Sequence, residues 1–361
     1  MTRLRNVAFS YDNALALMAF TAAGDWRRAG LLADAFVYAQ QHDRIYGDGR
    51  LRNAYQAGDL VLPPGWKPNH RIGTVRMPGW WDASKQNWFE DIQQVSSYDG
   101  DMAWVLLALI NYYDARGGEQ YRNAAIALGE WIEDNTRSAS GPGGYTGGVR
   151  GWETDPANVT WKSTEHNLDL MVAFARLAIA TGDPKWWERS DHARQLVDAM
   201  WNAAAGHYWT GTQEDGATPN QQAIPLDAQS WATLAFGPNP QTRRAIDFAT
   251  TNHLVTASGF SGFDFDTDRD QPWFEGTGQM ALAYNVLGRT DEATHVRDEL
   301  RKVQIAAPNA NDMGIVAATR DGLTTGFGWE YFNRLHVGAT GWFIFQELGY
   351  NPYWPSHARR R

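Results

Sequence analysis

The chain has 361 residues, 43% of them hydrophobic and 20% charged, so it is long enough to bury a large core within one domain. Its formal net charge of -9 argues against nucleic acid as a partner, because a protein that binds a phosphate backbone presents a basic surface. The absence of cysteine excludes disulfides, a thiolate nucleophile and cysteine-bound zinc, and no apolar run approaches the ~18 residues that a membrane span needs.

The two ends of the chain carry little sign of targeting. Residues Met1–Ser10 include basic side chains but no apolar stretch, so we expect a signal peptide to be absent or already removed. If one has been removed, the protein is expected to be periplasmic or secreted, and otherwise cytoplasmic. The basic cluster Arg359–Arg361 is interpreted as a frayed tail.

A helical hairpin recurs along the chain: a mostly apolar helix, a break at glycine, and an amphipathic helix with charged residues. Five complete hairpins are predicted, at Ala14–Ala23 and Trp26 to about Gln41; 102–115 and Gln120–Asn135; 168–180 and Pro184 to about Ala204; 228–236 and Pro240 to about Asn252; and Met280–Leu287 with a helix after Gly288. A sixth begins at 336–340, and its second helix is short, missing or supplied by other segments. Residues 42–97 form a long irregular insertion that is expected to be functional or to carry short strands.

Helices that are apolar on all sides suit a buried position, and amphipathic helices suit an outer layer. The sequence therefore predicts a single all-α domain over residues 1–361, an (α/α)6 toroid whose six inner helices run in one direction. Their N-termini then converge on one mouth. Each of these helix starts carries a polar or acidic residue: Asp12, Asp99, Glu165, Asp227, Glu275 and His336.

Acidic residues at helix starts have two interpretations. Asp12, Asp99 and Asp227 suit helix N-caps, because Asp is a favoured capping residue; of the neighbours Asp99 and Asp101, one can cap while the other faces the cleft. Glu165 and Glu275 are less natural caps. Paired carboxyl groups also cleave glycosides, in which one protonates the leaving oxygen and the other activates water or attacks the sugar. We expect the catalytic residues among Asp99, Asp101, Asp227, Glu165 and Glu275.

Aromatic residues are abundant, with 18 Trp, 14 Tyr and 15 Phe, and many lie in polar loops, as Trp66 does. Rings that stay exposed in a cleft stack on the C–H faces of sugars, whereas buried rings pack helix ends. The first interpretation predicts a carbohydrate substrate, held by side chains near the inner-helix starts: Tyr98, Trp161, His166, Trp273, Trp329, Glu330 and His336. Trp273 is also expected to raise the pKa of Glu275 by desolvation.

Three motifs carry a resemblance to a known group of enzymes: YDGD at 98–101, STEHN at 163–167 and WFEGTGQMALAY at 273–284. With the hairpin repeat, they resemble bacterial six-hairpin (α/α)6-barrel glycosidases over nearly the whole chain. The resemblance implies hydrolysis of a poly- or oligosaccharide without a cofactor and, as in family 8 and related endoglucanases, with inversion. It implies a Glu acid and an Asp base, chosen from the following residues: Glu165 or Glu275 as the acid, and Asp99, Asp101 or Asp227 as the base.

Three alternatives stay open on the same barrel. N-acylglucosamine and cellobiose 2-epimerases use two histidines for proton transfer, and His166 and His336 lie at inner-helix starts. A polysaccharide lyase would place His or Tyr around the reacting carbon. A non-catalytic sugar-binding protein would keep the aromatic residues but tolerate loss of Glu165 and Glu275. Carboxylates outnumber histidines at the predicted mouth, which favours hydrolysis.

The segment Asp264–Asp270 alternates acidic residues as a calcium-binding loop does, with Glu275 at its twelfth position. Its sixth position is Arg269 rather than the required glycine, and the flanking helices are wrong for such a loop. We interpret the segment as an acidic loop at the cleft edge that could hold the catalytic base, and we predict no metal site. The sequence also lacks glycine-rich nucleotide-binding loops and the HExxH and GxSxG motifs.

Overall fold

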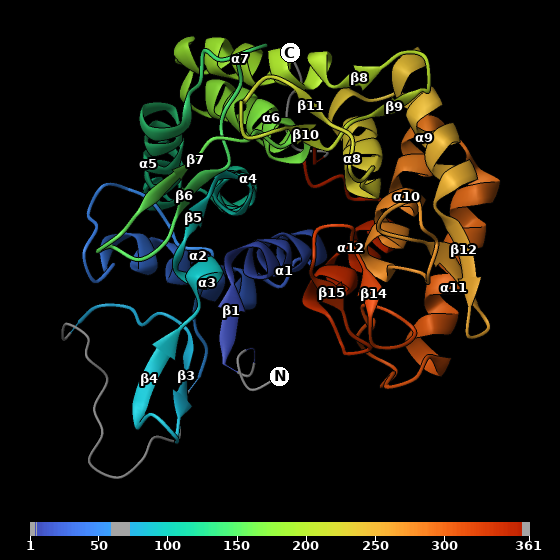
Figure 1. Ribbon diagram of the computed structural model, residues 1–361, viewed down its shortest axis with the longest axis horizontal. Helices are drawn as coiled ribbons and strands as arrows, with labels where there is room; N and C mark the ends of the chain where they lie inside the picture. Colours follow the sequence, from blue (N-terminus) through green and yellow to red (C-terminus); the bar gives the residue numbers. More distant parts are fainter. Residues whose placement is uncertain (1–3, 5, 59–72, 356–361) are drawn as a thin grey trace.

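Six helices form the inner ring of a helical toroid in the computed structural model, which describes residue 4 and residues 6–58 and 73–355 (Figure 1). They are α1 (Ser10–Ala23), α4 (Asp99–Arg116), α6 (Thr164–Thr181), α8 (Leu226–Phe236), α10 (Phe274–Leu287) and α12 (Val337–Leu348). Each inner helix contacts the next, and α12 contacts α1, so the ring is closed and the predicted (α/α)6 fold is confirmed. Trp66 and Arg359–Arg361 lie outside the described residues.

Five outer helices each pack against the inner helix that precedes them in the chain. They are α2 (Trp26–Gln41), α5 (Glu119–Thr136), α7 (Lys185–Ala199), α9 (Pro240–Asn252) and α11 (Thr290–Ala306). Burial follows the two layers: every residue of α10 from Phe274 to Tyr284 is buried, whereas the buried residues of α11 recur every three or four positions. A helix surrounded by others needs apolar or small residues on all faces, and an outer helix needs them on one.

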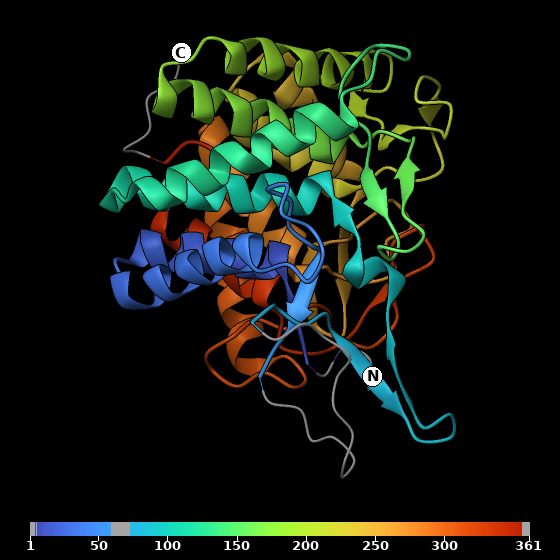
Figure 2. The same ribbon diagram turned by 90° about the vertical axis from the view of Figure 1, so that its left-hand side faces the viewer.

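The two ends of the toroid differ in the length of their connections. Each inner helix joins its outer partner through two or three residues, such as 24–25 and 182–184, and a glycine in the left-handed conformation ends α1, α6 and α10 there. Each outer helix returns to the next inner helix through a longer segment, from 21 residues (253–273) to 57 residues (42–98). Figure 2 shows the strands of these segments gathered at one end of the helices.

The strands are short and pair in antiparallel fashion. The pairs are β1 (Val7–Phe9) with β2 (Ala54–Gln56), β3 (Gly79–Asp82) with β4 (Asn87–Glu90), β8 (Trp201–Asn202) with β9 (His207–Tyr208), β10 (Gly211–Thr212) with β11 (Pro219–Asn220), β12 (Leu254–Ala257) with β13 (Phe260–Phe263), and β14 (Leu323–Thr324) with β15 (Glu330–Tyr331). A three-stranded sheet joins β5 (Ser97–Tyr98), β6 (Gly148–Arg150) and β7 (Ala157–Val159). The predicted insertion at 42–97 thus carries short strands, together with the one-turn helix α3 (Ile92–Val95).

Several helix boundaries differ from the prediction, and the inner helices of the five predicted hairpins all begin a few residues earlier than expected. The outer helix predicted to reach about Ala204 is α7, which ends at Ala199 because β8 and β9 pair directly after it. α1 begins at Ser10 rather than Ala14, so Tyr11 and Asp12 lie within its first turn. Among the described helices, none is both long and apolar enough to cross a membrane.

The sixth outer position holds no helix in the described chain, which continues from α12 to Pro355 without a further one. Residues 351–354 instead close the end of the ring opposite to the inner-helix N-termini. Asn351 Nδ2 donates to the carbonyl of Leu234 at 2.9 Å, and Arg176 donates to the carbonyl of Tyr353 at 2.9 Å. The fully buried Tyr353 therefore forms part of the barrel core.

Candidate active site

The second residues of the six inner helices meet around one mouth of the ring. They are Tyr11, Gly100, Glu165, Asp227, Glu275 and Gly338. Because the inner helices run in one direction, their first turns lie at one level. His166 occupies the space beside Gly100, and Glu275 occupies the space beside Gly338. The structure thus brings together three of the predicted acids, Glu165, Asp227 and Glu275.

Helix capping does not explain the aspartates at these helix starts. The N-cap residues of α1, α4 and α8 are Phe9, Tyr98 and Pro225, and none of them makes a side-chain capping hydrogen bond. Asp99, Asp101 and Asp227 lie inside the first turns instead. The capping interpretation of these residues is therefore wrong.

Glu275 is almost fully buried, at 2% exposure, and is held from two sides. The hydroxyl of Tyr11 donates a hydrogen bond of 2.5 Å to Glu275 Oε1 and itself accepts one of 3.1 Å from Trp342 Nε1. Burial raises the pKa of Glu275 to about 8; the charges of Asp12 and Asp227 add to the rise, and the Tyr11 hydrogen bond opposes it. Glu275 is therefore largely protonated at neutral pH.

His336 faces the other oxygen of Glu275. Its Nδ1 accepts a hydrogen bond from the backbone N–H of Ala339 at 3.1 Å and lies 3.4 Å from Glu275 Oε2. Burial lowers the pKa of His336, against the opposing charge of Asp12. A neutral imidazole with a lone pair on Nδ1 and a protonated Glu275 are compatible neighbours, whereas an ionised Glu275 would face that lone pair unfavourably.

Glu165 and Asp227, at the starts of α6 and α8, are neighbouring carboxyl groups that shift each other's pKa. Burial and then the charge of Asp227 raise the pKa of Glu165 well above its usual value. Burial also raises the pKa of Asp227, to about 6, while its hydrogen bonds to Ala228 N–H and to Glu165 hold it down. At neutral pH one proton is therefore shared by the pair and resides mainly on Glu165. Glu165 keeps partial exposure, whereas Asp227 is 4% exposed.

Asp101 and Asp12 lie on the next part of the rim, on α4 and α1, and both keep partial exposure. Burial raises the pKa of Asp101 to about 7, the backbone N–H of Tyr11 opposes the rise, and the charge of Asp12 adds to it. Burial likewise raises the pKa of Asp12. Among the described residues, no arginine or lysine is a main contributor to the shifts at these rim acids.

Asp99 lies apart from this group, although the sequence placed it among the catalytic candidates. Its side chain is fully buried, and Asp99 Oδ2 accepts a hydrogen bond of 2.6 Å from Thr136 at the end of the outer helix α5. Asp101 is two residues further along α4, about 200° around the helix. Asp99 and Asp101 therefore have different surroundings, and the hydrogen bond from Thr136 favours a structural role for Asp99.

An aromatic layer lies one turn below the carboxyl groups. The sixth residues of α4, α8 and α12 are Trp104, Trp231 and Trp342, whose ring centroids lie 5.0 to 6.1 Å apart. The sixth residue of α6 is Asp169, whose Oδ1 accepts a 2.5 Å hydrogen bond from Tyr353. Sequence reasoning missed this layer, but the signal was present: the same residue type recurs at one position of three apolar helices.

Trp161, one of the predicted sugar-binding residues, contacts two others, Tyr98 and His166. The ring of Trp161 lies 6.3 Å from that of Tyr98 and 5.7 Å from that of His166, and all three keep partial exposure. Burial lowers the pKa of His166 to about 4, and its Nδ1 has no hydrogen-bond partner among the described residues. A Cβ at Gly100 would lie 2.5 Å from the His166 ring, so glycine at this position makes room for it.

The remaining predicted binding residues lie around Tyr331, which sequence reasoning missed. Trp273 is buried and its ring lies 5.6 Å from that of Tyr331, while the exposed Trp329 lies 5.0 Å away. Burial and then the charge of Glu275 raise the pKa of Tyr331, which places its hydroxyl in the same electrostatic environment as the acids. Glu330 is exposed on β15, and its role in sugar binding stays a prediction.

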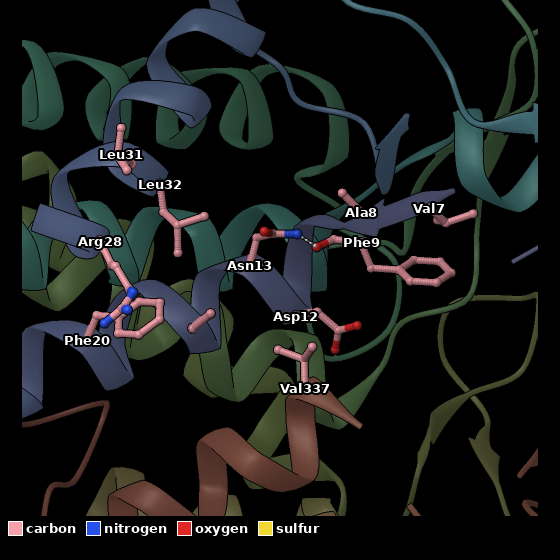
Figure 3. Close-up of a pocket in the computed structure, with 11 residues that line it drawn as sticks. Val7, Ala8, Phe9, Asp12, Asn13, Phe20, Arg28, Leu31, Leu32 and Val337 are labelled. Atoms are coloured by element: carbon pink, nitrogen blue, oxygen red, sulfur yellow. Dashed lines mark hydrogen bonds between the residues drawn. The ribbon is translucent and has the colours of Figure 1, made fainter. Parts of the chain in front are cut away.

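A separate groove of about 460 Å³ lies outside the ring, between α1, α2 and α12 (Figure 3). Its lining is Val7, Ala8, Phe9, Asp12, Asn13, Ala16, Phe20, Arg28, Leu31, Leu32 and Val337. It follows the open sixth outer position, and Asp12 is the only acid among its lining residues. This mostly apolar groove therefore shares Asp12, but none of the other acids, with the carboxyl site.

No known protein-family profile and no curated sequence matches the chain, but solved structures share its fold. A glycoside hydrolase family 76 mannosidase from Bacteroides thetaiotaomicron has a TM-score of 0.57 at 14% identity, over 95% of this chain and 87% of that one. A cellobiose 2-epimerase from Bacillus thermoamylovorans gives 0.60 at 11%, over 95% and 88%, and a D-mannose isomerase gives 0.62 at 12%, over 94% and 87%. At these identities the likeness concerns architecture alone. The chain therefore shares the (α/α)6-barrel fold of these structures.

Proposed function

We propose that the protein is a glycoside hydrolase that cleaves a poly- or oligosaccharide by general acid and base catalysis. The observation that carries the proposal is the Glu165–Asp227 pair. A general acid must hold a proton at neutral pH and still reach the leaving oxygen. The ionised Asp227 keeps the proton on Glu165, and Glu165 keeps partial exposure at the mouth.

Asp101 is the base in this proposal. It is the predicted acid that combines partial exposure with a pKa of about 7, so a substantial fraction is ionised at neutral pH. It lies on α4, the neighbour of α6 in the ring, and its charge raises the pKa of Asp169, one turn below Glu165 on α6. We favour inversion, which needs a carboxyl separation of roughly 6.5–9.5 Å to admit a water molecule.

Glu275 has a different role in the proposal. Glu275 is 2% exposed and contacts Tyr11 and His336. This position suits a residue that holds those two side chains in place rather than one that reaches the glycosidic oxygen. The ring pair Tyr98 and Trp161 supplies a platform for a sugar ring at the rim. The carbohydrate-processing enzymes among the structural neighbours support this substrate class.

The test uses three variants on a panel of polysaccharides and aryl glycosides. Glu165→Gln is expected to lower kcat/KM on a polysaccharide about 10²–10⁴-fold. It should lose much less on an aryl glycoside whose leaving group needs no proton. Asp101→Asn should lose activity on both substrates. Glu292→Gln, an exposed position on the outer helix α11, is the matched control and should keep full activity.

The outcome that counts against the hydrolase is turnover by Glu165→Gln and Asp101→Asn that equals the control on every substrate cleaved by the natural protein. Binding of oligosaccharides without any cleavage would indicate a sugar-binding protein instead. NMR that identifies whether the α or the β anomer of the new reducing end forms first distinguishes inversion from retention.

A sugar epimerase or isomerase is the second candidate, and the two rim histidines favour it. His166 and His336 lie at the starts of α6 and α12, and burial keeps both neutral, as proton acceptors must be. Such an enzyme exchanges the proton on carbon 2 of its substrate with solvent. Incubation of mono- and disaccharides in deuterated water distinguishes the two, because deuterium enters carbon 2 only if this candidate is correct.

A further inference from the structure

We propose that Asp264, Asp268 and Asp270 form a calcium site that is separate from the carboxyl groups of the mouth. The three residues lie in the segment between β13 and α10. One carboxylate oxygen from each lies within 4.8 Å of the other two, and they are the one such group of three potential metal ligands in the described part of the chain. The site is independent of the proposed function.

Unpartnered oxygen atoms in this cluster point to a missing ligand. Asp264 is 0% exposed; its Oδ1 accepts from the backbone N–H of Phe265 at 2.7 Å, but its Oδ2 has no partner among the described residues. Oδ1 of Asp270 is likewise buried without a partner. A buried carboxylate with open lone pairs is costly unless a cation or a donor satisfies it.

Positive side chains do not fill this role in the described structure. Arg320 is adjacent, but its guanidinium donates to the main-chain carbonyl of Asp270 at 2.9 Å rather than to a carboxylate. Asp268 keeps its exposure, so an ion can enter from solvent. Three acids that converge around a buried, unsatisfied oxygen therefore suit a cation.

The donor set and its size favour calcium. All three ligands are carboxylate oxygens, which hard divalent cations prefer, and Ca²⁺ binds oxygen at about 2.3–2.6 Å in flexible geometry. Three oxygens within 4.8 Å of one another can all contact such an ion. Mg²⁺ demands near-ideal octahedral geometry and usually keeps several waters, so three carboxylates from one loop suit it less well.

The site does not follow the calcium-loop numbering that the sequence suggested. Glu275, at the twelfth position, is bonded to Tyr11 in the mouth, and Asp266 faces Gly326, where a Cβ would lie 2.9 Å from Asp266 Oδ2. The ligands are thus three of the four alternating aspartates. The sequence pattern predicts no metal site when the segment is treated as one repeating loop, and we depart from that prediction here by using only three of the aspartates.

An ion at this position would hold the segment between β13 and α10 against the β14–β15 hairpin. Asp268 Oδ2 accepts from the hydroxyl of Thr324 at 2.7 Å, and Asp270 Oδ2 accepts from the backbone N–H of Thr324 at 3.0 Å. Thr324 belongs to the β14–β15 hairpin, which ends at Tyr331 beside Glu275. Calcium would therefore stabilise the chain and steady the hairpin without touching the reacting groups.

The test measures the thermal midpoint of the full chain in EDTA and in 1 mM CaCl₂, without substrate. We expect calcium to raise the Tm by about 3–4 °C if 1 mM is about 100 times the Kd. Asp264→Asn should abolish the response while keeping the Oδ1 acceptor, and in EDTA it should be at least as stable as the natural protein. Asp268→Asn, at an exposed position, should abolish or strongly reduce it.

Asp291→Asn, an exposed acid at the start of α11, is the matched control for loss of one charge and should keep the full response. Isothermal titration with CaCl₂ should give one site in the natural protein and none in Asp264→Asn. An absent Tm shift, or the same shift in Asp264→Asn, overturns the proposal. A response to MgCl₂ as large as that to CaCl₂ overturns the choice of calcium. None of these readouts depends on hydrolase activity.

Discussion

The Tyr11 hydroxyl and the Glu275 carboxyl are joined by a 2.5 Å hydrogen bond, although the residues are 264 positions apart in the chain. Their helices, α1 and α10, are not neighbours in the ring, because α12 lies between them. Glu275 also lies against the start of α12, where residue 338 is glycine. The position of Glu275, and with it this hydrogen bond, therefore depends on the lack of a side chain at residue 338.

Gly338→Ala tests that dependence. The new Cβ would lie 2.3 Å from Glu275 Oε2, so Glu275 or the start of α12 must move. We expect a loss of about 1–3 kcal/mol in the free energy of unfolding by urea. This loss is opposite in sign to the usual gain from replacing a helical glycine by alanine. Gly47→Ala, where a Cβ meets nothing within 4 Å, is the control, and equal stability of the two variants would contradict the prediction.

Tyr11→Phe removes the donor to Glu275 Oε1 and the acceptor of Trp342 Nε1 at once. Leaving buried polar groups without partners should cost about 1–3 kcal/mol in the free energy of unfolding. Tyr38→Phe is the matched control, because the Tyr38 hydroxyl makes an exposed bond of 3.4 Å. Urea unfolding at pH 7 compares the two, and a loss no larger than that of the control would refute the role of this bond.

Stability should fall as the pH rises from about 5 to 8. The folded state holds the proton of Glu275 up to about pH 8, whereas the unfolded chain releases it near 4.5. The folded state thus binds more protons in this window, and each such group contributes a negative slope of at most about 1.4 kcal/mol per pH unit. Glu275→Gln should flatten the slope of unfolding free energy against pH, and Glu292→Gln should leave it unchanged. A slope preserved in Glu275→Gln would show that this carboxyl ionises normally.

The proposed acid makes a prediction about the pH dependence of kcat/KM. Activity should rise through the pKa of Asp101, about 7, and fall where Glu165 loses its proton. In Asp227→Asn the negative charge that holds this proton is gone, so the pKa of Glu165 falls and the descending limb should move to lower pH. If the descending limb of Asp227→Asn stays at the same pH, the charge of Asp227 does not set the pKa of the general acid.

The layers of this fold could be predicted because hydrophobic patterns report burial directly. A run such as Met280–Ala283, which is apolar at every position, suits a helix that is surrounded by others, and the glycine-ended hairpins indicate which helix is inner and which is outer. The end of α7 could not be predicted, because the residues after Ala199 are compatible with helix and only the pairing of β8 with β9 ends it.

The site was predictable to the level of helix starts but not of individual side chains. Asp99 and Asp101 look alike in sequence, yet the helical rotation of about 100° per residue turns one towards Thr136 and the other towards the mouth. Tyr331 comes from a hairpin whose position depends on loop packing. Contacts between distant segments, such as Tyr11 with Glu275, follow from the closed ring and leave no local pattern.

The unequal connections of the ring have a consequence for how such a protein can diversify. Closing a loop twice as long costs only about 0.6 kcal/mol, so residues added to segments such as 42–98 are tolerated. An insertion into a two-residue turn such as 24–25 would shift an inner helix against its outer partner. Changes of sequence and length can therefore accumulate at the carboxyl-bearing rim while the helical framework stays constant.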